Sequence, residues 1–102
     1  MRFHELKQFV SSLPSHVEKS NGCEAVVYSY GNVHLLVPTK GPCKKYKVFE
    51  REKRVLATQF EEIALLKFAE LVGVREVKLT PEELAEMLTK YYFKGENKGY
   101  YM

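Results

Sequence analysis

The residue types best suited to chemistry in this chain are its two cysteines, Cys23 and Cys43, and two nearby histidines, His16 and His34. Thiolates and imidazoles are preferred ligands of Zn²⁺, but the separations between these four residues match no compact zinc pattern. In a reducing cytosol, two cysteines are most often free thiols. The sequence therefore favours two free thiols in the core, with a zinc site as the alternative, and predicts no metal and no cofactor.

Basic residues gather in one segment of the chain. The net charge is only +3, but residues 40–54 hold seven basic residues against two glutamates. Residues 55–89 hold three basic residues against seven glutamates. One surface should therefore be basic and another acidic, and a basic surface suits nucleic-acid phosphates. The candidate nucleic-acid-binding residues are Lys40, Lys44, Lys45, Lys47, Arg51, Lys53 and Arg54.

Aromatic residues gather at the C-terminal end. Five of the 13 aromatic residues fall among the last dozen positions, which is more than a small domain needs there. Tyrosine is enriched at protein interfaces. The candidate interface residues are Tyr91, Tyr92, Phe93, Tyr100 and Tyr101.

Length and composition predict a single domain, residues 1–102. No apolar run approaches the roughly 20 residues that span a bilayer, so no membrane partner is expected. The N-terminus has no apolar signal region, which favours a cytoplasmic protein. All 13 acidic residues are Glu, and this lysine- and glutamate-rich usage tilts toward a thermophile.

The elements that position these residues follow from the apolar spacing. Residues 3–13 carry apolar side chains at helical spacing. Gly31-Asn32 is a two-residue hairpin signal between apolar stretches 23–30 and 33–37, and it would pair Tyr28 with Leu35. Both faces of that hairpin are apolar, which predicts central strands covered on both sides.

The second half of the chain adds one strand, a helix, a further strand and a last helix. Residues 45–51 alternate and predict the third strand. Residues 58–72 form a long helix that is apolar nearly all round, which favours an oligomer or a partner subunit. Residues 75–79 are a short strand, and Thr80 caps the last helix. The predicted fold is α+β, a small mixed sheet in the order α-β-β-β-α-β-α.

Residues 5–79 resemble the core of the archaeal Holliday-junction resolvases, which have the restriction-endonuclease-like (PD-(D/E)-x-K) nuclease fold. The stretch "ELKQFVSSLPSHVEKSNG" is similar to their first helix and the loop that follows. "CEAVVYSYGNVHLLVPTK" is similar to their central hairpin, and "ALLKFAELVGVREVKLT" to their helix-strand passage. The resemblance implies a nuclease-like core and a nucleic-acid partner.

The resemblance also implies a metal site that has been lost. In that fold the hairpin carries one acid on its first strand and Glu-x-Lys on its second, and two carboxylates hold Mg²⁺. Here Glu24 occupies the place of the first acid, while Val37 and Thr39 replace the second acid and the lysine. One carboxylate cannot hold a hydrated Mg²⁺ with useful affinity, so no residue is expected to be catalytic.

A second resemblance is to the tRNA-splicing endonucleases of archaea, which work without a metal. "GCEAVVY" is similar to their Gly-x-Asp-Phe-x-x-Tyr strand and aligns Tyr28 with the family tyrosine. His34 lies near the family histidine, while Val74 or Arg75 stands at the lysine. Because these enzymes also use non-catalytic subunits, the chain could be such a structural subunit; Glu24, His34, Val37 and Thr39 then form a vestigial site.

These patterns predict a non-catalytic nuclease-fold protein that binds nucleic-acid backbone or serves as the structural subunit of a nuclease, DNA and RNA both remaining open. The expected assembly is a homodimer or a complex with another subunit. The alternative is a small protein–protein interaction module that uses the aromatic tail and acidic helices. In that alternative, the lysines only keep the protein in solution.

Overall fold

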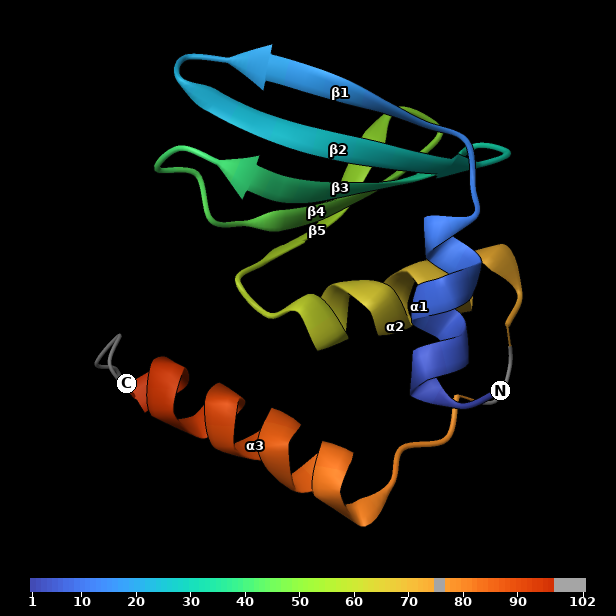
Figure 1. The fold of residues 1–102 in the computed structure, drawn as a ribbon, viewed down its shortest axis with the longest axis vertical. Helices are drawn as coiled ribbons and strands as arrows, with labels where there is room; N and C mark the ends of the chain where they lie inside the picture. Colours follow the sequence, from blue (N-terminus) through green and yellow to red (C-terminus); the bar gives the residue numbers. More distant parts are fainter. Residues whose placement is uncertain (75–76, 97–102) are drawn as a thin grey trace.

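The computed structural model describes residues 1–74 and 77–96, which form an α+β fold (Figure 1). Five antiparallel strands make one sheet in which each strand lies beside the next along the chain, in the order β1-β2-β3-β4-β5. The helices are α1 (Phe3–Ser11), α2 (Glu61–Val72) and α3 (Pro81–Glu96). The strands are β1 (Ser15–Ser20), β2 (Cys23–Tyr30), β3 (Val33–Lys40), β4 (Tyr46–Glu50) and β5 (Lys53–Thr58).

The central hairpin has the predicted register. Tyr28 faces Leu35 and Val26 faces Val37 across the β2–β3 pair. The turn between them begins at Gly31, whose φ of 60° favours glycine. This hairpin sets the alternation of side chains for the rest of the sheet.

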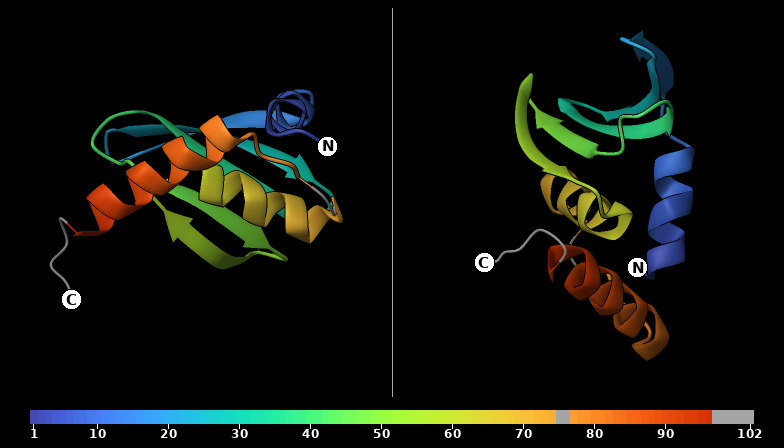
Figure 2. Two further views of the ribbon diagram at one scale, coloured as in Figure 1. Left: turned by 90° about the horizontal axis from the view of Figure 1, so that it is seen from below. Right: turned by 90° about the vertical axis from the view of Figure 1, so that its left-hand side faces the viewer.

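The helices α1 and α2 cover one face of the sheet, the core face (Figure 2). Leu6 of α1, Phe68 of α2, Leu35 of β3 and Val48 of β4 are almost fully buried there. Helix α1 is confirmed, and α2 is confirmed except at its start, because it begins at Glu61 and the predicted first residue, Thr58, is the last residue of β5. Both helices bury their apolar side chains against the sheet. Gly73, with φ of 91°, ends α2 in the left-handed conformation that glycine adopts easily.

The cap of α1 is a charged contact. The Arg2 backbone N–H donates to Glu5 Oε1 at 2.7 Å, and this hydrogen bond holds the pKa of Glu5 below its usual value. Because the pKa of Glu5 is lower in the folded state, its carboxylate stabilises the folded protein at pH values above its unfolded-state pKa. This contribution to folding stability is lost as the pH falls through the folded-state pKa of Glu5.

No described helix covers the opposite, open face of the sheet (Figure 2), so the prediction of a hairpin covered on both sides is wrong. One row of side chains across this face runs from His16 on β1 through Val27, Leu36 and Lys47 to Ala57 on β5. The sheet curls so that its edges turn away from α2, which makes the open face concave. We call this concave face the trough.

The sheet differs from the predicted mixed sheet, because the described strands are all antiparallel. The sequence missed two strands, β1 and β5, one at each edge. Of the predicted strand 75–79, Arg75 and Glu76 lie outside the described residues, and Lys78 forms only an isolated parallel bridge with Arg2. An isolated bridge adds no strand to the sheet.

The two cysteines are not free thiols, since Cys23 and Cys43 form a disulfide with their Cα atoms 5.8 Å apart. The hairpin explains the contact. Glu24 at the start of β2 lies opposite Lys40 at the end of β3. The chain after Lys40 therefore needs only a short reversal to bring Cys43 back to Cys23.

That reversal depends on Gly41, whose φ is 93°. A Cβ atom at residue 41 would collide with the carbonyl oxygen of Gly22 and lie 2.9 Å from the Cys23 Cα. We expect Gly41→Ala to lower the free energy of unfolding by about 2 kcal/mol, because positive φ and the close approach both oppose a side chain. Urea denaturation measures this change.

The matched control is Gly31→Ala, at a position that has φ of 60° but no atom within 4 Å of the added Cβ. It should lower the free energy of unfolding by about 1 kcal/mol, from backbone strain alone. Equal losses in the two variants would show that the β3–β4 loop does not pack against the β1–β2 turn.

Helix α3 lies beyond α2, on the side away from the sheet (Figure 1). Its predicted cap is confirmed: the Thr80 N–H donates to Glu83 Oε1 at 2.8 Å, and the Glu83 N–H donates to Thr80 Oγ1 at 3.1 Å. Leu84 and Leu88 are 43% and 42% exposed. Helix α3 therefore presents at least these two apolar side chains to solvent.

Candidate nucleic-acid interface

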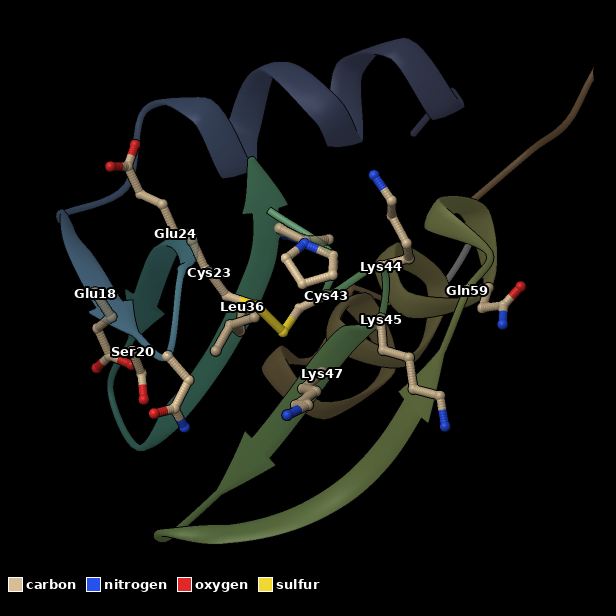
Figure 3. A pocket seen from close by; sticks show the side chains of 14 residues that line it. Glu18, Ser20, Cys23, Glu24, Leu36, Cys43, Lys44, Lys45, Lys47 and Gln59 are labelled. Carbon is tan, nitrogen blue, oxygen red and sulfur yellow. A yellow bond between two sulfur atoms is a disulfide. The ribbon is translucent and has the colours of Figure 1, made fainter. Parts of the chain in front are cut away.

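Three of the predicted basic residues, Lys44, Lys45 and Lys47, line one hollow in the trough and are called the lysine cluster here. The hollow has a volume of about 600 Å³ (Figure 3). Its apolar lining includes Ala25, Leu36 and Pro38, and its far wall carries Glu18 and Ser20 of β1. Because both β1 and β4 residues line it, the hollow follows from the curl of the sheet.

The lysine cluster is held by the fold at both ends. Lys47 belongs to β4 and pairs with Leu36 on one side and Ala57 on the other. Lys44 and Lys45 follow Cys43, whose disulfide to Cys23 fastens the loop to the start of β2. Within the described part of the chain, no ion pair involves any of the three lysines. Their charges are thus available to an anionic partner.

The other predicted basic residues lie elsewhere. Lys40 shares a cross-strand row with Lys19 and Glu24, and its Nζ lies 4.0 Å from a Glu24 carboxylate oxygen. Arg51 lies in the β4–β5 turn and Lys53 follows that turn, at the far end of β4 from Lys44 and Lys45. The seven predicted nucleic-acid-binding residues therefore lie in separate parts of the surface and do not form one cluster.

Arg54 follows Lys53 on β5. Unlike Arg51 and Lys53, it lies on the same open face as the lysine cluster. It lies opposite Phe49 of β4, and Phe49 in turn lies opposite His34 of β3. His34 Nδ1 and Ser29 Oγ are hydrogen-bonded at 2.7 Å. This row, Ser29-His34-Phe49-Arg54, crosses four strands of the open face. Sequence reasoning missed Phe49, although its alternation with Lys47 already placed both on the same face.

The four residues of the vestigial site do not converge on one point. Val37 faces the core, while His34 is on the open face, so the alternation of side chains along β3 separates them. Glu24 forms ion pairs with Lys19 at 3.6 Å and Lys40 at 4.0 Å. The Thr39 hydroxyl donates to the Glu24 carbonyl oxygen at 3.0 Å, a contact of structural character.

The metal-free alternative also lacks a converging site. Tyr28 packs against the core, whereas His34 lies on the opposite face of the sheet. Val74 also packs against the core, and Arg75 lies outside the described residues. Among the described side chains, no group of three or more histidines, cysteines and acids is placed to hold a metal ion. The zinc alternative also loses both thiols to the disulfide.

The predicted aromatic interface falls largely on residues that the structure does not describe. Tyr100 and Tyr101 are outside the described residues, as are the side chains of Tyr91, Tyr92 and Phe93 in α3. In residues 1–74 and 77–96, none of the helices has both the length and the apolar character that crossing a membrane demands.

The chain was compared with protein-family models, curated proteins and solved structures, and nothing in any of the three matches it.

Proposed function

We propose that this protein binds nucleic acid without cleaving it, through phosphate contacts made by the lysine cluster. The observation that carries the proposal is that Lys44, Lys45 and Lys47 all line one hollow, with no ion pair to any of them among the described residues. Phosphate groups attract lysine ammonium ions without any reading of base sequence. Binding to the backbone should therefore be largely independent of sequence.

The proposal also covers the ancestry, the subunit role and the cellular location of the protein. The nuclease-like ancestry and a role as the structural subunit of a nuclease remain part of it, since a divided vestigial site is compatible with a non-catalytic chain. A cytoplasmic location agrees with a disulfide in hyperthermophile archaea, whose intracellular proteins are often disulfide-rich. The lysine- and glutamate-rich composition points the same way.

The test is a triple variant in which Lys44, Lys45 and Lys47 become alanine. Three lost phosphate contacts should weaken binding about a hundredfold near 0.1 M salt and flatten the dependence of log K on log salt by about two units for a single strand. Fluorescence anisotropy of a labelled oligonucleotide at several salt concentrations measures both quantities.

The matched control replaces Lys7, Lys67 and Lys78 with alanine, which removes the same charge away from the trough. Lys7 and Lys67 lie on the helices and pair with Glu61 and Glu70. The control should bind within a factor of about three of the parent, because only remote charges change. Equal weakening by both triple variants would mean that net charge, rather than the trough, drives binding.

The rival function, a protein-interaction module, is favoured by one observation. Leu84 and Leu88 of α3 are apolar side chains that are more than 40% exposed to solvent. If the triple variant of Lys44, Lys45 and Lys47 binds nucleic acid as tightly as the parent, these lysines only form a solvated surface. Helix α3, joining two copies or a second subunit through Leu84 and Leu88, would then define the function.

A further inference from the structure

We propose that the trough takes a single-stranded nucleic acid, with its backbone along the β4–β5 wall and a base stacked on Phe49. This inference rests on the proposed function and names its substrate class. It differs from phosphate binding alone because it requires an aromatic contact and an unpaired strand.

Phe49 lies where a base could reach it. It belongs to the open face, since it follows Lys47 by two positions and neighbours His34 and Arg54 on adjacent strands. It is absent from the core cluster, in which Tyr46 and Val48 of the same strand take part. A phenyl ring beside Lys47 and Arg54 is a platform on which any base can stack while these two cations hold its phosphates.

The floor next to Phe49 is apolar. Val27 and Leu36 form the middle of the neighbouring cross-strand row, between His16 and Lys47. Val27 is 6% exposed and is already covered by its neighbours, so Leu36, which is half-buried, is the apolar side chain of this row that a ligand can reach. The faces of unpaired bases can cover such a surface, whereas the phosphates of a duplex would leave it bare.

The two walls of the trough differ in charge, and this fixes where the backbone runs. The β4–β5 wall carries Lys47 and Arg54, and Lys45 lies directly before β4. The β1 wall carries Glu18, which is paired with His16 at 2.9 Å. A carboxylate repels phosphate, so the backbone should follow the lysines and the bases should point inward across the floor.

The width of the trough favours a single strand over a double helix. Five strands with four gaps of about 4.8 Å give an arc of about 19 Å, and the curl makes the mouth narrower than the arc. A duplex has two backbones with base pairs between them and is about as wide as the flattened sheet. A single strand therefore fits inside the trough better than a duplex does.

His34 supplies a polar group beside the stacking site. Its Nδ1 is engaged by the Ser29 hydroxyl at 2.7 Å, which leaves Nε2 for the edge of a base or a phosphate oxygen. The interaction with Ser29 fixes the ring before any ligand arrives.

The experiment compares single-stranded and duplex oligonucleotides of equal length on the parent, Phe49→Ala and Phe49→Trp. The parent should bind the single strand at least about tenfold more tightly than the duplex. Phe49→Ala should lose about tenfold for the single strand, and Phe49→Trp should keep parental affinity, because base–aromatic stacking is strong and tolerates any aromatic ring. The chain has no tryptophan, so the indole introduced by Phe49→Trp is a unique fluorescent reporter that base stacking should quench.

The control is Tyr30→Ala, which removes an exposed aromatic ring from the core-face side of the same sheet and should leave affinity unchanged. Unquenched tryptophan fluorescence in the bound state would overturn the inference, and so would duplex binding as tight as single-strand binding. If the lysine triple variant loses binding while Phe49→Ala does not, this inference fails and the proposed function stands. If the parent binds neither oligonucleotide, both fail.

Discussion

Phe68→Ala should lower the free energy of unfolding by about 3–5 kcal/mol. Phe68 is fully buried at the centre of α2, where it belongs to one core cluster with Leu6, Leu35 and Val48. Truncation removes the transfer free energy of the ring and leaves a cavity that the close-packed core fills only in part. Chemical denaturation followed by circular dichroism measures the loss.

The matched control for this substitution is Leu84→Ala on α3. Leu84 is 43% exposed, so the loss should be well under about 1 kcal/mol. Phe68→Ala should also affect the trough, because α2 packs against β3 and β4 from the core face. A loss below about 1 kcal/mol for Phe68→Ala would contradict the assignment of this face as the core.

Removing the disulfide should cost about 3 kcal/mol. The bond joins residues 20 positions apart, and in the chain-entropy model a loop of this length restricts the unfolded chain by about that free energy. The double variant Cys23→Ser/Cys43→Ser should therefore unfold at lower urea, and reductant should lower the stability of the parent by the same amount. Because the bond also fastens Lys44 and Lys45, nucleic-acid affinity should fall as well.

The double variant is its own control for the reductant, which should leave it unchanged. Denaturation curves of parent and double variant, each with and without reductant, complete the set. Superimposable curves for all four samples would contradict a structural disulfide and restore the prediction of two free thiols.

Local patterns in the sequence predicted the centre of the fold well. The Gly31-Asn32 turn fixed the register of β2 and β3, and the Thr80–Glu83 pair capped α3 as expected. These features depend on turn and cap chemistry that acts over a few residues. The amphipathic spacing of α1 and the glycine that ends α2 belong to the same class.

The edges of the sheet escaped prediction for physical reasons. Every residue of β1 is exposed, so the strand shows no apolar alternation, although Asn21-Gly22 after it is a hairpin signal. The turn before β5 is formed by Arg51 and Glu52 with φ of 53° and 68°. Residues other than Gly, Asn and Asp rarely adopt this conformation, so nothing in the sequence marked the turn.

The candidate site was only partly predictable. The basic segment was visible in the composition, but strand register decides which residues share a face, and it separates Lys40 from Lys47. The disulfide was missed because it depends on a tertiary contact between the β2 start and the β3–β4 loop. Phe49 was missed because the sequence of a single strand does not show which face of the sheet lacks a covering helix.

The most direct test of the trough as the binding surface is a nuclear magnetic resonance titration of ¹⁵N-labelled protein with a single-stranded oligonucleotide. We expect the amide signals of Leu36, Lys45, Lys47, Phe49 and Arg54 to shift, and those of α1 and α2 to stay in place. Shifts confined to the helices, or no shifts at a concentration that saturates binding, would contradict the account.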